Sequence, residues 1–177
     1  ADFGVEVLRE ARHEQVDADA HALTVVSPGG RRVLADVAFA HAVPHYRAPR
    51  WIADAGLATE PTPGLVDIDP QTLRSRRHGS VWALGDAADA TTRPSGGALR
   101  KQVAVLAQNL AAARGGKPLQ RYDGYTVVPI TVDRRKLALN EVDRDGEPSP
   151  SVPLIDPFVP RRSAWLFDRY VLPQVYW

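Results

Sequence analysis

The chain has 177 residues with 44% hydrophobic and 24% charged side chains, and its 22 basic groups nearly balance its 21 acidic groups. This composition excludes wholesale disorder, and the net charge of +1 argues against a general nucleic-acid binder, which needs a basic surplus. Cysteine is absent, and no apolar run approaches the roughly 18–20 residues that a membrane-spanning helix needs.

The N-terminal quarter of the chain reads as strands connected by turns. Alternating or β-branched apolar residues predict strands over 4–8, 12–16, 22–27, 31–34 and 36–43. Pro28, Gly29 and Gly30 supply one of the turns, because glycine tolerates positive φ. We expect an antiparallel meander that leads back into a buried strand.

Three short elements are expected next: a helix over 51–55, a strand at 65–68 and a buried strand at 81–84. The last of these stops at Gly85 and Asp86, which is the pattern of a strand that ends at a sharp turn.

The clearest helix spans 96–113 and has Ser95 as a suitable N-cap. Its apolar residues share one face, namely Leu99, Val103, Leu106 and Leu110. Gly115 and Gly116 end it.

The C-terminal third is richer in proline, and 148–160 is too rich in it for regular structure. Strands are expected at 125–130 and 136–142, and a helix at 163–170.

The stretch between Ser80 and Gln102 offers the clearest binding chemistry. Gly85 permits a tight turn, and Asp86 then presents a carboxylate that accepts hydrogen bonds from ligand hydroxyls. The following helix begins with Gly96 and Gly97, which allow close approach to unpaired N–H groups at the positive end of the helix dipole. The alternative is structural: Asp86 caps a turn, and the two glycines only pack closely.

This stretch resembles the flavin-binding signature of the pyridine nucleotide–disulfide oxidoreductase superfamily, and the chain resembles its sulfide:quinone oxidoreductases more narrowly. The similar blocks occur in family order, as HAVP at 41–44, GLVDID at 64–69, YDGYT at 122–126, LP at 172–173 and YW at 176–177. They extend over essentially the whole chain, which we identify as the C-terminal portion of such a flavoprotein.

The resemblance implies an α/β fold: part of a Rossmann-like flavoprotein with two dinucleotide-binding domains, a β-meander and a C-terminal α+β region. Residues 1–78 would form part of an NAD(P)-binding-like domain, 79–117 the FAD-facing strand and helix, and 118–177 the C-terminal domain. The implied activity passes electrons from sulfide, or another small sulfur donor, through FAD to a quinone.

Residue by residue, the resemblance places Gly85 and Asp86 at the flavin, with Asp86 on the ribityl chain. Gly96, Gly97 and Ala98 would present helix N–H groups to the pyrimidine edge of the isoalloxazine ring, and Gln102 matches a family glutamine near the flavin.

At the C-terminal end, Trp165, Phe167 and Tyr170 are candidates for the quinone site and for contact with a membrane surface, with core packing as the alternative.

Three departures from the family pattern limit which of the family's properties we expect of this chain. Val128 stands where the family has a redox cysteine, so no catalytic residue is predicted in this chain. The family's lysine before the flavin helix falls on Pro94, with Arg93 adjacent as a replacement cation. The sequence has no G-x-G-x-x-G to clasp the FAD pyrophosphate, and it opens on Ala1 in a segment that reads as mid-domain. We therefore expect a fragment that is inactive alone and that partners the N-terminal remainder of the same protein.

Alternatives remain open at this point. A related flavoprotein with NAD(P)H or a thiol as its donor fits Val128, and a non-enzymatic scaffold that has lost flavin is a second possibility. No metal site is expected, because Pro44 separates His41 from His45. The expected location is the cytoplasm, with a peripheral place on the inner face of a membrane.

Overall fold

The computed structural model describes residues 4–43, 47–58, 64–153 and 155–176. Of the positions singled out above, Pro44, His45 and Trp177 lie outside these ranges. The chain forms two compact units, Ala1–Tyr46 and Arg47–Trp177. The boundaries predicted at 78 and 118 fall inside the second unit and stay predictions about the domains of a longer protein.

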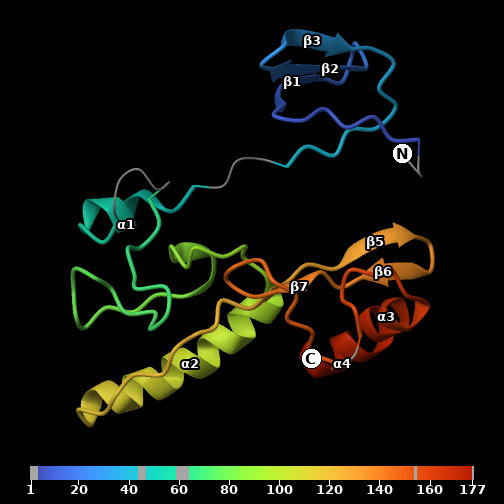
Figure 1. The fold of residues 1–177 in the computed structure, drawn as a ribbon. Coiled ribbons are helices and arrows are strands. Elements are labelled where there is room, and N and C mark those ends of the chain that lie inside the picture. The colour runs from blue at the N-terminus through green and yellow to red at the C-terminus, as the bar shows by residue number, and fades with distance from the viewer. Residues whose placement is uncertain (1–3, 44–46, 59–63, 154, 177) are drawn as a thin grey trace. The chain divides into compact units, whose positions relative to one another are not determined.

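The first unit is a three-stranded antiparallel sheet in the order β1-β2-β3 (Figure 1). Its strands are β1 (Arg12–Asp17), β2 (Ala22–Ser27) and β3 (Gly30–Leu34). Ser27 pairs with Gly30 across a two-residue turn, and Gly30 has a φ of 110°, which only glycine adopts without strain. The predicted meander is confirmed in these three strands.

Two predicted strands of this unit are wrong. Residues 4–8 and 36–43 run without regular structure, and Val7 and Phe39 are 70% and 85% exposed. Val37 donates its N–H to the His21 carbonyl oxygen at 2.8 Å, but no ladder follows among the described residues. Apolar alternation alone does not make a strand, because a strand also needs a neighbour to share its hydrogen bonds.

The second unit is built around the long helix α2 (Gly96–Arg114), with the short helix α1 (Arg50–Asp54) and the 3₁₀ turn η1 (Gly85–Ala87) preceding it. The predicted bounds of both helices are confirmed to within a residue. The predicted buried strand at 81–84 is wrong, because only Trp82 forms a bridge there and the segment is half-buried. At 65–68 the strand is reduced to isolated bridges at Val66 and Ile68.

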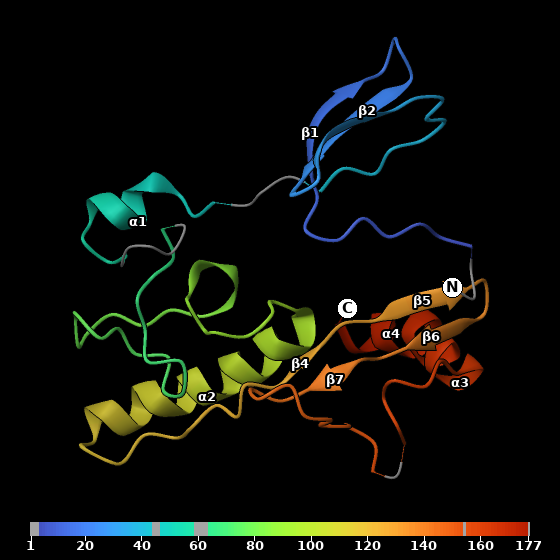
Figure 2. The ribbon, with the colours of Figure 1, turned by 45° about the horizontal axis from the view of Figure 1, so that its top comes forward.

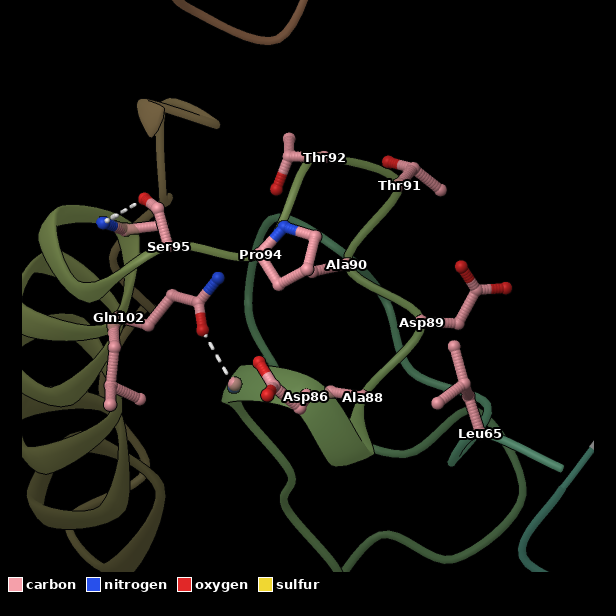
Figure 3. Close-up of a pocket in the computed structure, with 13 residues that line it drawn as sticks. Leu65, Asp86, Ala88, Asp89, Ala90, Thr91, Thr92, Pro94, Ser95 and Gln102 are labelled. Atoms are coloured by element: carbon pink, nitrogen blue, oxygen red, sulfur yellow. Dashed lines mark hydrogen bonds between the residues drawn. The ribbon is translucent and has the colours of Figure 1, made fainter. Parts of the chain in front are cut away.

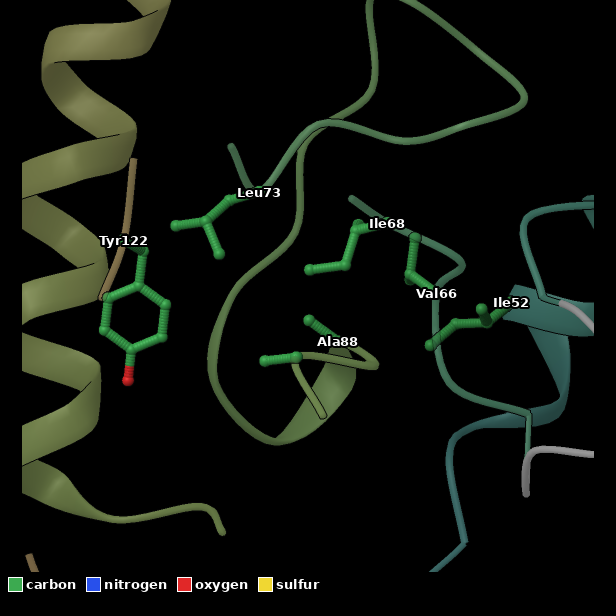
Figure 4. Packing of buried hydrophobic residues seen from close by; sticks show 7 residues of the cluster. Ile52, Val66, Ile68, Leu73, Ala88 and Tyr122 are labelled. Carbon is green, nitrogen blue, oxygen red and sulfur yellow. The ribbon is translucent and has the colours of Figure 1, made fainter. Parts of the chain in front are cut away.

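The core of the second unit lies between these loops and α2, and Figure 4 shows its side chains from close by. Its buried members are Ile52, Val66, Ile68, Leu73, Ala88, Ala90 and Tyr122. Of the four apolar residues that share one face of α2, only Leu106 belongs to the inward face, where it packs against the core. The helix buries Ala98, Gln102 and Asn109, while Leu99, Val103 and Leu110 remain 40–50% exposed.

The rest of the unit consists of two small antiparallel sheets and a helical end. Its strands are β4 (Thr126–Val127), β5 (Ile130–Asp133), β6 (Lys136–Ala138) and β7 (Glu141–Val142). Strand β4 pairs with β7, and β5 with β6. The predicted strands at 125–130 and 136–142 are therefore each broken in two.

The chain ends in α3 (Arg162–Leu166), the π-helical turn η2 (Phe167–Val171) and α4 (Leu172–Tyr176). Helix α3 lies beside the β5–β6 hairpin (Figure 2). This mixture of strands and helices is consistent with the predicted α/β class. The Rossmann-like part of that prediction remains a prediction, since the named strands of the described residues pair antiparallel only.

Candidate functional site

A hollow of about 500 Å³, counting its open mouth, lies between the turn η1 and the start of α2. Four of the six predicted cofactor-binding residues line it: Gly85, Asp86, Ala98 and Gln102. The 91–95 loop supplies the facing wall with Thr91, Thr92, Pro94 and Ser95 (Figure 3). We call this space the first hollow.

Gly85 and Gln102 form the hydrogen bond that joins the turn to the helix. The Gly85 N–H donates to Gln102 Oε1 at 2.8 Å, and Gln102 is buried. Gly85 has a φ of 65°, and a Cβ there would lie 3.1 Å from Leu99 Cδ1, so glycine suits the position on both counts. Gln102 therefore fixes the distance between η1 and α2.

Tyr122 lies behind Gln102 and completes a buried polar chain. Burial raises the pKa of the Tyr122 hydroxyl above its ordinary value. Hydrogen bonds with the Gln102 and Thr92 side chains act to lower this pKa, but burial outweighs them. The hydroxyl donates in turn to the Tyr125 carbonyl oxygen. At neutral pH the tyrosine is thus neutral and holds the helix against the segment that follows it.

Asp86 is the one predicted ligand-binding side chain that extends freely into solvent at the hollow. It is exposed, and the described residues offer its carboxylate no hydrogen-bond donor. In Figure 3 its oxygens lie on the side of the turn nearer Gln102, whereas the Asp89 carboxylate points away. A carboxylate so placed can accept hydrogen bonds from the hydroxyls of a bound molecule.

The start of α2 is capped as predicted. Ser95 Oγ accepts the Ala98 N–H at 3.0 Å, so that donor is engaged within the chain. The Thr126 hydroxyl and the Val127 N–H also approach Ser95 Oγ, at 2.9 and 3.3 Å. One serine hydroxyl thus ties the helix N-terminus to β4.

Gly96 and Gly97 do not line the first hollow. A Cβ on Gly97 would lie 2.3 Å from Val127 Cγ1 and 3.4 Å from Tyr125 Cε1. Gly97 is therefore required by close packing against β4, which was the structural alternative for this glycine. The N–H groups of Gly96 and Gly97 have no acceptor among the described residues.

Arg144, which is 54 residues from Ala90 and 53 from Thr91 in the sequence, holds the wall of the hollow that the 91–95 loop forms. Its guanidinium donates to the Ala90 carbonyl oxygen at 3.1 Å and to Thr91 Oγ1 at 2.9 Å. It also donates to the carbonyl oxygens of Pro70 and Tyr122, at 3.0 and 3.3 Å. A single side chain thus links three segments that have no regular secondary structure.

Lys101 does not reach the first hollow. Its ammonium pairs with Asp123 at 3.0 Å and lies 3.9 Å from the centre of the Tyr125 ring. Burial acts to raise the pKa of Asp123, but the Tyr125 N–H and Lys101 outweigh it and hold that pKa below its ordinary value. The pair belongs to the junction between α2 and β4.

The predicted quinone-site aromatics lie together on α3 and η2. Trp165 and Tyr170 meet edge to face with ring centres 6.1 Å apart, and Arg169 lies 5.6 Å from each ring. Trp165 is half-buried, while Phe167 and Tyr170 are 43% and 58% exposed. Their exposure favours a surface role over core packing for the latter two.

The described part of the chain has neither a membrane-spanning helix nor a cluster of metal-ligating side chains. None of its helices is both long and apolar enough to cross a membrane. Nor does that part hold three or more metal-ligating side chains in one group.

Sequence reasoning missed several residues of this site. The 91–95 segment is held as a wall of the hollow by Arg144, which no local motif marks. The bond between Gly85 and Gln102 was also missed, although a glutamine on an apolar helix face is a signal that could have found it.

Comparison with known proteins gives two kinds of match. The chain is 33% identical over 138 residues to the mitochondrial sulfide:quinone oxidoreductase of Dictyostelium discoideum, and 26% identical over 138 residues to that of Mus musculus. Each match covers 77% of this chain and 30% of the relative, so the chain spans about a third of their length. No family model matches the chain.

Among solved structures, the chain is similar to one chain of the Tetrahymena thermophila mitochondrial ATP synthase. The TM-score is 0.73 at 26% identity, over 84% of this chain and 36% of the other. The two oxidoreductase matches confirm the resemblance to sulfide:quinone oxidoreductases that the sequence predicts.

Proposed function

We propose that this chain is part of an FAD-dependent oxidoreductase that passes electrons from sulfide, or another small sulfur donor, to a quinone. The observation that carries the proposal is its similarity, over 77% of its length, to two relatives named for that reaction. The first hollow supports it independently, because it offers an unpartnered carboxylate opposite a helix N-terminus.

The residues of the first hollow fit an FAD in part. Asp86 is exposed and free to accept hydrogen bonds from ribityl hydroxyls. Next to the hollow but outside its lining, the unengaged N–H groups of Gly96 and Gly97 at the positive end of α2 would favour negative charge on the pyrimidine edge. The Ala98 N–H is taken by Ser95, so Ala98 would contact the ring only through its methyl group. When bound, the flavin supplies the transfer of electrons.

This chain's own residues would bind and orient the flavin, and would not react with the sulfur donor. The sequence holds no cysteine, and Val128 occupies the position of the family's redox cysteine. A valine forms no thiolate or disulfide, so this chain has no side chain that could take part in the sulfur redox chemistry for which the family uses cysteine. An electron donor other than sulfide, such as NAD(P)H or a thiol, is therefore a variant of this proposal that an experiment must distinguish from it.

The C-terminal helices would supply the quinone side. Exposed Phe167, Tyr170 and Val171 lie beside Arg169, and such a mixture suits the boundary between lipid headgroups and acyl chains. We propose a peripheral contact with the inner face of a membrane, from which a quinone would reach the flavin.

A non-enzymatic scaffold is the second candidate, and one observation favours it. A chain of similar fold occurs in a structure of a mitochondrial ATP synthase, at 26% identity to this one. The valine at position 128 agrees with the loss of a reaction. In this case the fold would persist without its flavin.

Flavin content and redox behaviour of the intact protein that contains this chain discriminate between these candidates. Visible absorbance that bleaches with sulfide and recovers with a quinone analogue is expected. Bleaching by NAD(P)H but not by sulfide would support the other donor. A colourless protein that takes up no added FAD would contradict the oxidoreductase and favour the scaffold.

Two variants test the place of the flavin. Asp86→Ala should weaken FAD binding by about tenfold to a hundredfold, since hydrogen bonds to charged groups contribute about 1.5–3 kcal/mol. Asp89→Ala is the matched control, because this carboxylate lines the same hollow but points away from Gln102 (Figure 3). Equal affinity of the two variants, measured by fluorescence titration, would mean that Asp86 does not hold the ribityl chain.

A further inference from the structure

A second hollow, distinct from the first, lies between the 91–93 loop, the end of β4, and the β7 strand with the turn that follows it. Its volume is about 760 Å³, counting its open mouth. The two hollows share Thr91 and Thr92, so only the thickness of the 91–95 loop separates them. None of the six predicted cofactor-binding residues lines it.

One side of the second hollow is apolar. Val128 and Val142 are half-buried in its wall, and Phe158 is 44% exposed at the same place. These side chains would contact a flat or branched hydrocarbon group and remove it from water.

The other side presents two polar groups on anchored backbone. The Arg93 carbonyl oxygen accepts a hydrogen bond from the Thr126 hydroxyl at 2.8 Å, which anchors the backbone of Arg93. The guanidinium of Arg93 has no partner among the described residues. Asn140 donates its N–H to the Pro157 carbonyl oxygen at 3.0 Å, and its side-chain amide is likewise without a partner in that part of the chain. A guanidinium and an amide are both hydrogen-bond donors that suit a carboxylate, and both residues line this hollow.

The charges around the hollow set the charge of its ligand. Its charged lining residues are Arg93, Arg144 and Asp143, and the Asp143 carboxylate accepts the N–H groups of Asp145 and Glu147 at 2.9 and 3.0 Å. The lining side chains therefore carry a single excess positive charge, which attracts a carboxylate and gives a neutral molecule of the same shape no such advantage.

From these features we propose that the second hollow binds a small organic monoanion, with its carboxylate on Arg93 and Asn140 and its apolar body on Val128, Val142 and Phe158. The proposal does not depend on flavin binding, because it uses no predicted residue of the first hollow.

Benzoate is the probe, and benzamide, which has the same shape without the charge, is its control. Titration of the chain with benzoate should shift the methyl resonances of Val128 and Val142 with saturation in the millimolar range. Benzamide should bind several-fold more weakly. Absence of shifts at both valines, or equal affinity for benzoate and benzamide, would overturn the proposal.

Arg93→Gln should weaken benzoate about fivefold, as expected for an exposed ion pair, and should leave benzamide unchanged. Arg134→Gln is the matched control, since Arg134 lies in the turn between β5 and β6 and lines neither hollow. Benzoate affinity that is the same in both variants would refute the assignment of Arg93. Arg93→Lys, which keeps the charge, should retain most of the affinity.

Discussion

Asn109 should be among the residues on which the stability of the second unit depends most. It is fully buried in α2, and its side-chain amide donates to the carbonyl oxygens of Thr72 at 2.9 Å and Gln120 at 3.1 Å. Its Oδ1 accepts the Gln120 N–H at 2.6 Å. The side chain thus connects the helix to two segments without regular secondary structure.

Asn109→Ala removes all three bonds. A typical intramolecular hydrogen bond contributes about 1 kcal/mol net, and the backbone groups that lose their partner become unsatisfied next to a new cavity. We therefore expect the free energy of unfolding to fall by about 3 kcal/mol. Asn109→Asp keeps the acceptor but has no donor, and should lose at least as much.

Urea unfolding followed by circular dichroism measures this loss. Gln108→Ala is the control, because Gln108 is exposed on the neighbouring position of the same helix and should change stability by less than about 0.5 kcal/mol. If Asn109→Ala and Gln108→Ala unfold at the same urea concentration with the same slope, the amide does not stabilise the fold and the reasoning is refuted.

Three further predictions follow from the contacts around the candidate site. Gly97→Ala should lower the free energy of unfolding by about 1–3 kcal/mol in urea, because the alanine Cβ would overlap the Val127 side chain. Adding Val127→Ala should restore stability, and a double variant that stays as unstable as Gly97→Ala would argue against packing as the cause. Arg144→Lys should cost about 1–3 kcal/mol, because an ammonium cannot reach acceptors on three segments; a loss no greater than that of Arg134→Lys would contradict this. The lowered pKa of Asp123 stabilises the folded state above the ordinary value of 3.8, and this contribution is lost as pH falls through the folded pKa. Asp123→Asn should therefore flatten the acid end of a plot of stability against pH, and an unchanged slope would show that the Lys101 pair does not matter.

The sequence predicted the extent of α2 but not its buried face. The apolar pattern groups Leu99, Val103, Leu106 and Leu110 on one face, but only Leu106 of these packs against the core, and the helix buries Gln102 and Asn109 instead. The loops around α2 have backbone groups that no strand partner satisfies, and a buried amide side chain satisfies them. An apolar pattern cannot reveal this requirement, because it arises from segments distant in the sequence.

The strands also show that local sequence pattern does not reveal contacts between distant segments. The β1–β3 meander could be predicted, because its strands pair with their neighbours in the sequence and a tight turn sets their register. Residues 36–43 have an equally suitable apolar pattern but lack a partner among the described residues, and Phe39 is left 85% exposed. Local pattern predicts which segments can form strands, and pairing decides which of them do.

Position 128 shows why the sequence predicts only part of the candidate site. Side chains alternate along an extended segment, so Thr126 and Val128 face the second hollow while Val127 packs on Gly97. The resemblance to sulfide:quinone oxidoreductases identifies 128 as a cysteine position, but not what its replacement does to the surroundings. With valine there, the wall that would have carried a thiol becomes apolar and continuous with Val142 and Phe158. The substitution that removes sulfur chemistry therefore also makes the apolar surface on which the proposed monoanion would rest.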